Sequence, residues 1–244
     1  MIEHHLDLPT DDGAMTTFVV HPEEGGPHPV VLFYMDAPGK REELHTMARR
    51  IAAVGYCVVL PNLYHRSSAD FWLKERTEPA MAEMFALMAT LNARTTECDT
   101  RALLAYVDAL PQADASRIGA LGYCMSGPFV VWAAGQFPER LRSIASIYGA
   151  NMATDAPDSP HRVVDKIHCE SYFGCAEIDR WAPPADIQKL QAALKAAGTQ
   201  HRIEWYPAAE HGFAFPQRAG AYKQDAAERH WERLFSLFDR TLRH

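Results

Sequence analysis

Residues 119–128 read Gly-Ala-Leu-Gly-Tyr-Cys-Met-Ser-Gly-Pro and lie between two apolar runs. The pattern predicts a sharp turn from a strand into a helix, which holds one side chain at its tip in strained backbone. The residues two before and two after that tip must be small. With Cys124 at the tip, Gly122 and Ser126 take those places. With Ser126 at the tip, Pro128 would take one of them, and a proline ring is difficult to fit there.

The chemistry of this turn is therefore that of a nucleophilic thiol. Cys124 would stand at the amino end of the following helix, where the positive end of the helix dipole favours a thiolate. The alternative is a buried structural cysteine in a glycine-rich turn, since motif matches include false positives.

A nucleophile on such a turn needs a base, and the base needs an acid to orient it. The chain order in enzymes with this turn is nucleophile, acid, histidine. His211 follows a strand-like run and precedes Gly-Phe-Ala-Phe, and Asp179 lies in a loop after the apolar segment 171–174. Cys124 and Asp179 are 55 residues apart, and Asp179 and His211 are 32 apart. Each separation is long enough for a crossover between parallel strands, so the three loops can meet at one sheet edge.

The choice of acid has one competitor. Glu177 lies two residues before Asp179 and has a longer side chain, and either carboxylate can instead be a solvated loop residue. We prefer Asp179 because it stands where the loop turns back from the strand end. Among the twelve histidines, six occur in terminal, turn or helical polar contexts and are expected to be solvated: His4, His5, His21, His28, His230 and His244.

Two backbone amides are candidates for stabilising an oxyanion. One belongs to Met125, the residue after the nucleophile. The other comes from the loop Met-Asp-Ala-Pro-Gly that follows the strand-like run 29–34. Pro38 has no N–H, so Ala37 is the candidate donor, and Asp36 would lie near the thiol.

Short apolar runs alternate with longer amphipathic ones, which predicts an α/β fold with a mostly parallel twisted sheet and helices on both faces. No linker or repeat divides the chain, so residues 1–244 are expected to form a single domain without a large lid. Strands are expected at 14–20, 29–34, 56–60, 117–121, 142–148, 168–174 and 201–206, the first two joined as a hairpin by the turn 21–27. Helices are expected at 42–54, 78–92, 96–109, 126–137, 185–197 and 219–242.

Composition excludes several classes of function. The chain has 244 residues, 48% of them hydrophobic and 23% charged, which is ordinary for a globular protein. A net charge of −7 argues against binding to nucleic acid or an anionic membrane. No apolar run approaches the ~20 residues of a membrane span, and the start lacks the features of a secretory signal.

Five scattered cysteines without a Cys-x-x-Cys pair suit reduced thiols in the cytoplasm better than a disulfide scaffold. No group of cysteines and histidines has the spacing of a zinc site, so no metal is expected. Cys175 lies near the proposed acid loop and is expected to be inert.

Together these motifs resemble the dienelactone hydrolase family of α/β-hydrolases, over nearly the whole chain. The most specific match is Gly-Tyr-Cys followed by Ser-Gly, and Pro-Asn-Leu-Tyr at residues 61–64 is similar to the family's Pro-Asp-Leu-Tyr. The resemblance implies hydrolysis of small lactones or esters without a metal or organic cofactor. It also implies a triad of Cys124 as nucleophile, Asp179 as acid and His211 as base.

The chain departs from the family pattern at two positions. Characterised members place a glutamate in the loop position of Asp36, where it interacts with the thiol, and aspartate is shorter by one methylene. They also place an arginine, which grips the substrate carboxylate, where this chain has Phe215. A phenyl ring has no donors, so neutral acyl groups are expected to be preferred. Arg66 can substitute for the missing arginine or be a solvated loop residue.

The sequence thus predicts an ester or lactone hydrolase that acts through an acyl-enzyme on a small molecule, as a monomer or homodimer. The first alternative is a binding protein that keeps the fold without turnover. The second is a thiol-redox protein, for which Cys175 is the one plausible partner of Cys124.

Overall fold

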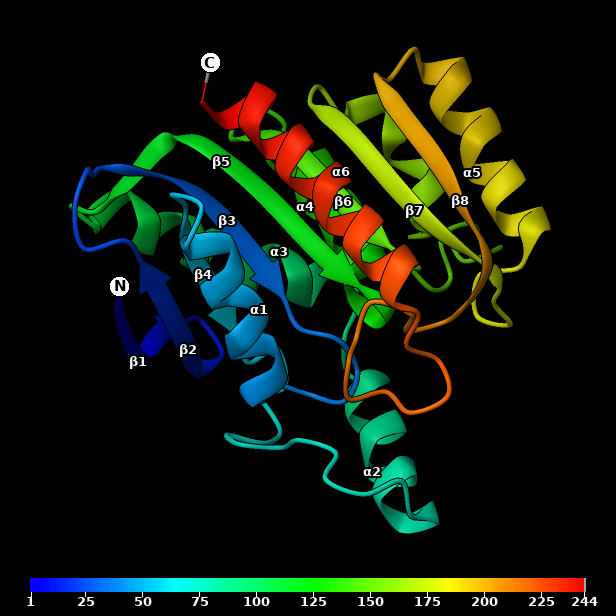
Figure 1. Ribbon diagram of the computed structural model, residues 1–244, viewed down its shortest axis with the longest axis horizontal. Coiled ribbons are helices and arrows are strands. Elements are labelled where there is room, and N and C mark those ends of the chain that lie inside the picture. The colour runs from blue at the N-terminus through cyan, green and yellow to red at the C-terminus, as the bar shows by residue number, and fades with distance from the viewer. Residues whose placement is uncertain (244) are drawn as a thin grey trace. The chain divides into compact units, whose positions relative to one another are not determined.

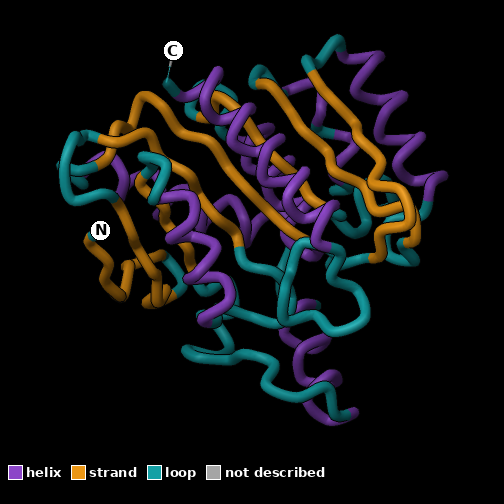
Figure 2. The backbone as a smooth tube through the Cα atoms, viewed as in Figure 1, coloured by secondary structure: helices purple, strands orange, loops and turns teal. Residues whose placement is uncertain are grey.

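The computed structural model describes residues 1–243, and its backbone is shown in Figures 1 and 2. The chain falls into two compact units, Met1–Ile118 and the part from Gly119 onward, which are described separately. The expectation that residues 1–244 form a single domain stays a prediction.

The first unit holds four strands in the order β1-β2-β4-β3. β3 and β4 are parallel, whereas β2 is antiparallel to both β1 and β4. The strands are β1 (Ile2–Thr10), β2 (Gly13–His21), β3 (His28–Tyr34) and β4 (Cys57–Pro61). The helices are α1 (Glu42–Ala52), α2 (Glu78–Met88) and α3 (Ala93–Ala109).

The expected hairpin between residues 14–20 and 29–34 is wrong. The strand 13–21 forms its hairpin with β1, in a register that pairs Ile2 with His21, and β3 lies beside β4. The reason is the crossover through α1, which returns β4 parallel to β3 and so occupies the edge that a β2–β3 hairpin would need. β1 was not expected, because its alternating polar residues leave most of it exposed.

The second unit holds the end of β5 and three further strands in the order β5-β6-β7-β8. The pairs β6–β7 and β7–β8 are both parallel. α4 and α6 pack on β6 from opposite faces (Figure 1). The strands are β5 (Ala113–Tyr123), β6 (Leu141–Ile147), β7 (Glu170–Ile178) and β8 (His201–Glu210), and the helices are α4 (Gly127–Gln136), α5 (Pro184–Ala197) and α6 (Gln224–Leu242).

Local signals explain where several helices begin and end. Asn92 accepts hydrogen bonds from the amides of Arg94 and Thr95, and the Thr95 hydroxyl accepts one from the Asn92 amide. This reciprocal cap starts α3 three residues before the expected helix at 96. α5 begins at Pro184 and ends at Ala197, and the following Gly198, with a φ of +70°, caps the helix in the left-handed conformation.

β3 and β4 are buried throughout and β6 and β7 over most of their length, and the core is built largely from the aliphatic and aromatic side chains of such strands. Three histidines expected to be solvated are instead buried: His21, His28 and His230. His230 lies on the buried face of α6 and accepts or donates a 2.8 Å hydrogen bond with the Tyr123 hydroxyl. His244 lies outside the described residues. None of the described helices has the length and apolar character to cross a membrane.

Candidate active site

Cys124 stands at the tip of the turn between β5 and α4. Its φ is 55°, a conformation that non-glycine residues seldom adopt, and residues 124–126 form a single 3₁₀ turn. A Cβ at Gly122 would overlap the Ser126 carbonyl, and one at Gly127 would overlap Gly149. The close packing at Gly122 agrees with the expected need for a small residue two positions before Cys124, and Gly127, three positions after it, is a second place without room for a side chain.

His211 and Asp179 form a buried pair at the ends of β8 and β7. The imidazole Nδ1 lies 2.7 Å from Oδ2 of Asp179, and the two side chains are 8% and 1% exposed. Oδ1 of the same carboxylate accepts hydrogen bonds from the amides of Trp181 (2.8 Å) and Ala182 (3.2 Å). These amides fix the carboxylate, which in turn fixes the ring orientation of His211.

The other ring nitrogen of His211, Nε2, is buried and meets the geometry of a hydrogen bond with no described residue. The Cys124 sulfur is nevertheless close enough to act on it electrostatically. Burial lowers the pKa of His211, but the Cys124 charge and the Asp179 carboxylate outweigh burial and raise the pKa to about 9. The site therefore favours the protonated imidazole of His211 near neutral pH.

Glu177, the competing acid, makes no contact with His211. Its carboxylate accepts a 2.7 Å hydrogen bond from the amide of Ala208 on β8. The structure thus brings Asp179, rather than Glu177, to the imidazole.

Sequence reasoning missed Tyr148, whose ring lies edge-on to His211 with centroids 5.0 Å apart. Tyr148 is fully buried, has a φ of 38°, and also contacts Phe213 and Phe215. Its position directly after β6 was the available signal, because the carboxyl ends of parallel strands meet at one sheet edge.

Phe215 is 1% exposed and packs edge-on against Tyr123 at 5.2 Å. It is thus part of the aromatic core beneath the turn. Sequence reasoning also missed Arg218, whose guanidinium lies over Gly212, beside His211, so closely that any side chain at 212 would overlap it. Within residues 1–243, Arg218 has no carboxylate partner. The only signal in the sequence was a basic residue in the histidine loop.

In the first unit, Asp36 is 1% exposed and is held by Arg41 at 2.5 Å and 3.3 Å. Arg41 also donates to the Glu43 carboxylate at 2.6 Å and to the Gly39 carbonyl at 3.0 Å. Asp36 is therefore already paired with a guanidinium, which the expectation of a contact with the thiol did not include.

Ala37 lies in the same loop and is 4% exposed. Its carbonyl accepts a 2.8 Å hydrogen bond from the Tyr64 hydroxyl, which fixes the peptide plane. Its amide has no hydrogen-bond partner among the described residues. A buried free amide held in a fixed plane is suited to bind an anionic oxygen.

Arg66 forms ion pairs with two carboxylates. It donates to Asp99 at 2.7 Å and 3.1 Å and to Asp12 at 2.7 Å. The same Asp99 carboxylate contacts His65 at 3.1 Å. Of its two readings, a substrate-binding arginine and a loop residue, these ion pairs favour the second.

Two further points concern the reactivity of Cys175 and the presence of metal ligands. Burial raises the pKa of the Cys175 thiol to about 12, which agrees with an inert residue. Within the described part of the chain, no three histidine, cysteine or acidic side chains are arranged to hold a metal ion.

Comparison with known proteins identifies the family to which the chain belongs. The family model named "Dienelactone hydrolase family" matches residues 15–242. A Synechocystis sp. protein named "Putative carboxymethylenebutenolidase" is 28% identical over 98% of this chain and 96% of its own length. A protein of the same name from Methylorubrum extorquens is 26% identical over 98% of this chain and 81% of its own length.

Solved structures share the fold. A Klebsiella pneumoniae protein titled "Putative Dienelactone Hydrolase" superposes with a TM-score of 0.87 at 22% identity, covering 97% of this chain and 98% of that one. A dienelactone hydrolase-like promiscuous phosphotriesterase from metagenomic libraries gives 0.80 at 16% identity, covering 98% of both chains. The expected α/β-hydrolase fold with a mostly parallel sheet is confirmed. The chain belongs to the dienelactone hydrolase family, a family of lactone and ester hydrolases.

Proposed function

We propose that the protein hydrolyses small lactones or carboxylic esters through Cys124, His211 and Asp179. The observation that carries this proposal is the buried 2.7 Å contact between Asp179 and His211, with the strained Cys124 beside the imidazole. An oriented base next to a nucleophile on a sharp turn is the arrangement that acyl transfer requires.

In the first half-reaction, the Cys124 thiolate attacks the carbonyl carbon of the substrate and forms a tetrahedral intermediate. The amides of Ala37 and Met125 are the proposed donors to its oxyanion, supported by the free amide of Ala37 and by the place of Met125 directly after the nucleophile. The carbon–oxygen bond to the leaving group then breaks, and the leaving alkoxide takes the proton of the His211 imidazolium. For a lactone, the released hydroxyl stays attached to the acyl group.

In the second half-reaction, neutral His211 takes a proton from water, and the resulting hydroxide attacks the thioester. Collapse of this intermediate releases the carboxylic acid and returns the thiolate–imidazolium pair. Asp179 keeps the same imidazole tautomer throughout and stabilises the positive charge. The sum is ester plus water to acid plus alcohol, with no other reactant.

Replacement of Cys124 tests this proposal. We expect the purified protein to hydrolyse members of a panel of aryl esters and lactones, and Cys124→Ala to lose at least ~10³-fold in kcat with an unchanged melting temperature. Iodoacetamide should abolish wild-type activity in parallel with alkylation of Cys124, as read by peptide mass. A folded wild type without turnover would favour the binding protein, and activity in Cys124→Ala above a few per cent would remove the thiol from the mechanism.

For the substrate, we propose neutral and partly apolar acyl groups. Phe215 supplies no donor, and Arg66 is already paired with Asp99 and Asp12. The carboxymethylenebutenolidase name of the relatives points instead to an acid, and Arg218, which has no carboxylate partner within residues 1–243, is a candidate to bind one. The test compares kcat/KM for a dienelactone carboxylate and its methyl ester in wild type and Arg218→Gln. We expect the methyl ester to be preferred, and a carboxylate preference lost in Arg218→Gln would assign its recognition to Arg218.

A further inference from the structure

We propose that Glu177 and Lys223 are positioning residues that hold a bulge in β8 and thereby deliver His211 to Asp179. This inference rests on the proposed hydrolysis for its kinetic test. It also makes a structural claim about the position of His211 that can be measured without turnover.

The bulge lies directly before the histidine. Along β7 and β8 the pairing is regular as far as Ala176 and Tyr206, and the next pair is Ile178 with Glu210. One residue of β7 therefore faces three residues of β8, Pro207 to Ala209. Such a bulge leaves backbone groups unpaired and re-aims the residues that follow it. Here the residue that follows the restored pair is His211.

The backbone of the bulge is strained, and two charged side chains hydrogen-bond to it. Ala208 has a φ of 52°, in the left-handed region that suits glycine. The Glu177 carboxylate accepts a 2.7 Å hydrogen bond from the Ala208 amide, which has lost its partner in the ladder. The Lys223 ammonium donates a 2.7 Å hydrogen bond to the neighbouring carbonyl of Pro207. Each charged side chain satisfies one of the backbone groups that the bulge exposes.

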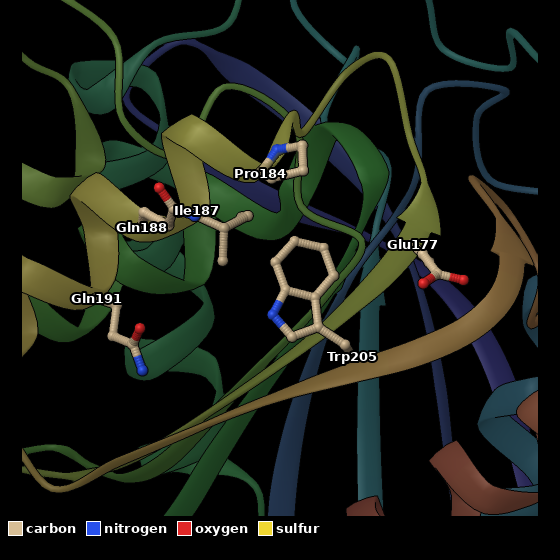
Figure 3. Close-up of a pocket in the computed structure, with 6 residues that line it drawn as sticks. All are labelled: Glu177, Pro184, Ile187, Gln188, Gln191 and Trp205. Atoms are coloured by element: carbon tan, nitrogen blue, oxygen red, sulfur yellow. The ribbon is translucent and has the colours of Figure 1, made fainter.

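The surroundings of Glu177 fit this assignment. Glu177 lines a surface groove of about 370 Å³ with Pro184, Ile187, Gln188, Gln191 and Trp205. Its carboxylate points away from the Trp205 ring and toward β8 (Figure 3). Glu177 is exposed, and solvent screens its charge from His211. Glu177 therefore acts on His211 through the geometry of the bulge.

The two carboxylates at the end of β7 then have complementary tasks. Glu177 fixes the start of the segment 208–211 at Ala208, and Asp179 fixes its end at His211. Without the first contact, Ala208 can relax from its left-handed conformation, and the imidazole moves relative to Asp179 and Cys124. Small displacements of a catalytic group are costly because transfer of its proton requires close alignment.

The kinetic test compares Glu177→Ala with Glu177→Gln, whose amide oxygen can still accept the Ala208 hydrogen bond. We expect Glu177→Ala to lower kcat about 10- to 100-fold with little change in KM, and Glu177→Gln to stay within about threefold of wild type. The double variant Glu177→Ala/Ala208→Gly should regain most of the loss, because glycine tolerates the positive φ without the carboxylate. Lys223→Met should show a smaller loss of the same kind. Equal losses in Glu177→Ala and Glu177→Gln, or no rescue by glycine, would overturn the proposal.

The structural test follows the His211 ring by NMR titration and the Ala208 amide by hydrogen exchange. In Glu177→Ala the His211 pKa should fall toward its ordinary value, and the Ala208 amide should exchange at least about tenfold faster than in wild type. Glu232→Ala removes one exposed carboxylate from α6 and is the matched control, in which neither signal should move. An unshifted His211 titration in Glu177→Ala would refute the positioning role even in a protein without turnover. Conversely, absent hydrolysis with a shifted titration would count against the proposed function alone.

Discussion

The residues with the most specific demands on their surroundings are His211 and Asp179. Because Oδ1 of Asp179 is held by two amides, only Oδ2 is available to the imidazole. The carboxylate therefore selects one tautomer and one ring orientation, and Glu177, on another partner, cannot replace it.

We expect Asp179→Asn to lower kcat/KM by roughly 10³- to 10⁴-fold, because an amide can donate to Nδ1 and select the wrong tautomer. Glu177→Gln should cost far less, since its contact to Ala208 needs only an acceptor. The measurement is kcat/KM for one aryl ester in both variants. The reverse ranking would transfer the orienting role to Glu177.

The raised pKa of His211 predicts a pH dependence. Leaving-group departure needs the imidazolium, so kcat/KM should decline with a basic limb near the His211 pKa of about 9. Asp179→Asn removes one cause of the raised pKa, so its basic limb should lie at lower pH. If the basic limb stays at the same pH in Asp179→Asn, it reports the titration of a group other than His211.

The same pKa predicts a change in stability, with a definite sign. The pKa of His211 is higher in the folded chain (about 9) than in the unfolded chain (about 6.5), so the folded state binds the proton more tightly. The stabilisation is fully present below about pH 6.5 and is lost as pH rises through about 9. Urea unfolding of wild type and His211→Gln at pH 6.5 and pH 9.5 should show a larger difference at the lower pH.

At the scale of elements, the turn from β5 to α4 depends on close backbone approach. Gly122 has no room for a side chain because the Ser126 carbonyl lies against it. Tyr123 and Ser126 close the turn through reciprocal contacts, in which the Tyr123 amide donates to the Ser126 hydroxyl at 3.0 Å and that hydroxyl donates to the Tyr123 carbonyl at 3.1 Å. These contacts of the neighbouring residues hold the Cys124 backbone in its strained conformation.

Gly122→Ala should accordingly lower the free energy of unfolding by about 1–3 kcal/mol and reduce the rate of Cys124 alkylation. Gly198→Ala is the matched control, because Gly198 has a φ of +70° but nothing within 4 Å of an added Cβ. It should cost about 1 kcal/mol and leave alkylation unchanged. Denaturant unfolding and iodoacetamide kinetics read the two effects. Equal alkylation rates in both variants would show that the turn tolerates a side chain at 122.

At the scale of the whole molecule, the net charge of −7 acts on charged substrates before they bind. Long-range repulsion slows the approach of an anion and is screened by salt, with a Debye length of about 30 Å at 0.01 M and about 8 Å at 0.15 M. We expect kcat/KM for a carboxylate-bearing ester to rise about two- to fivefold over this range of ionic strength. The neutral methyl ester is the control and should not respond. A decrease for the anion would mean that local positive charge, with Arg218 as the nearest candidate to His211, dominates its approach.

Much of the geometry of the candidate site could be predicted from the sequence because its constraints are local. The steric rule on the two flanking residues selected Cys124 over Ser126, and the overlap at Gly122 is the same rule seen in space. The order of nucleophile, acid and histidine selected His211 from twelve histidines. The apolar run before each loop predicted that the loop follows a strand, because strands buried in a parallel sheet have nearly continuous apolar sequences.

Only the tertiary structure decided features that depend on pairing between distant segments. It gave Asp179 rather than Glu177 to the imidazole, because the bulge of β8 uses Glu177 to satisfy a backbone amide. It paired Arg66 with Asp99, and it put His230 in the core against Tyr123. It also joined β2 to β1 instead of β3. Local composition does not specify these choices, because each depends on which partner the sheet register brings within hydrogen-bond distance.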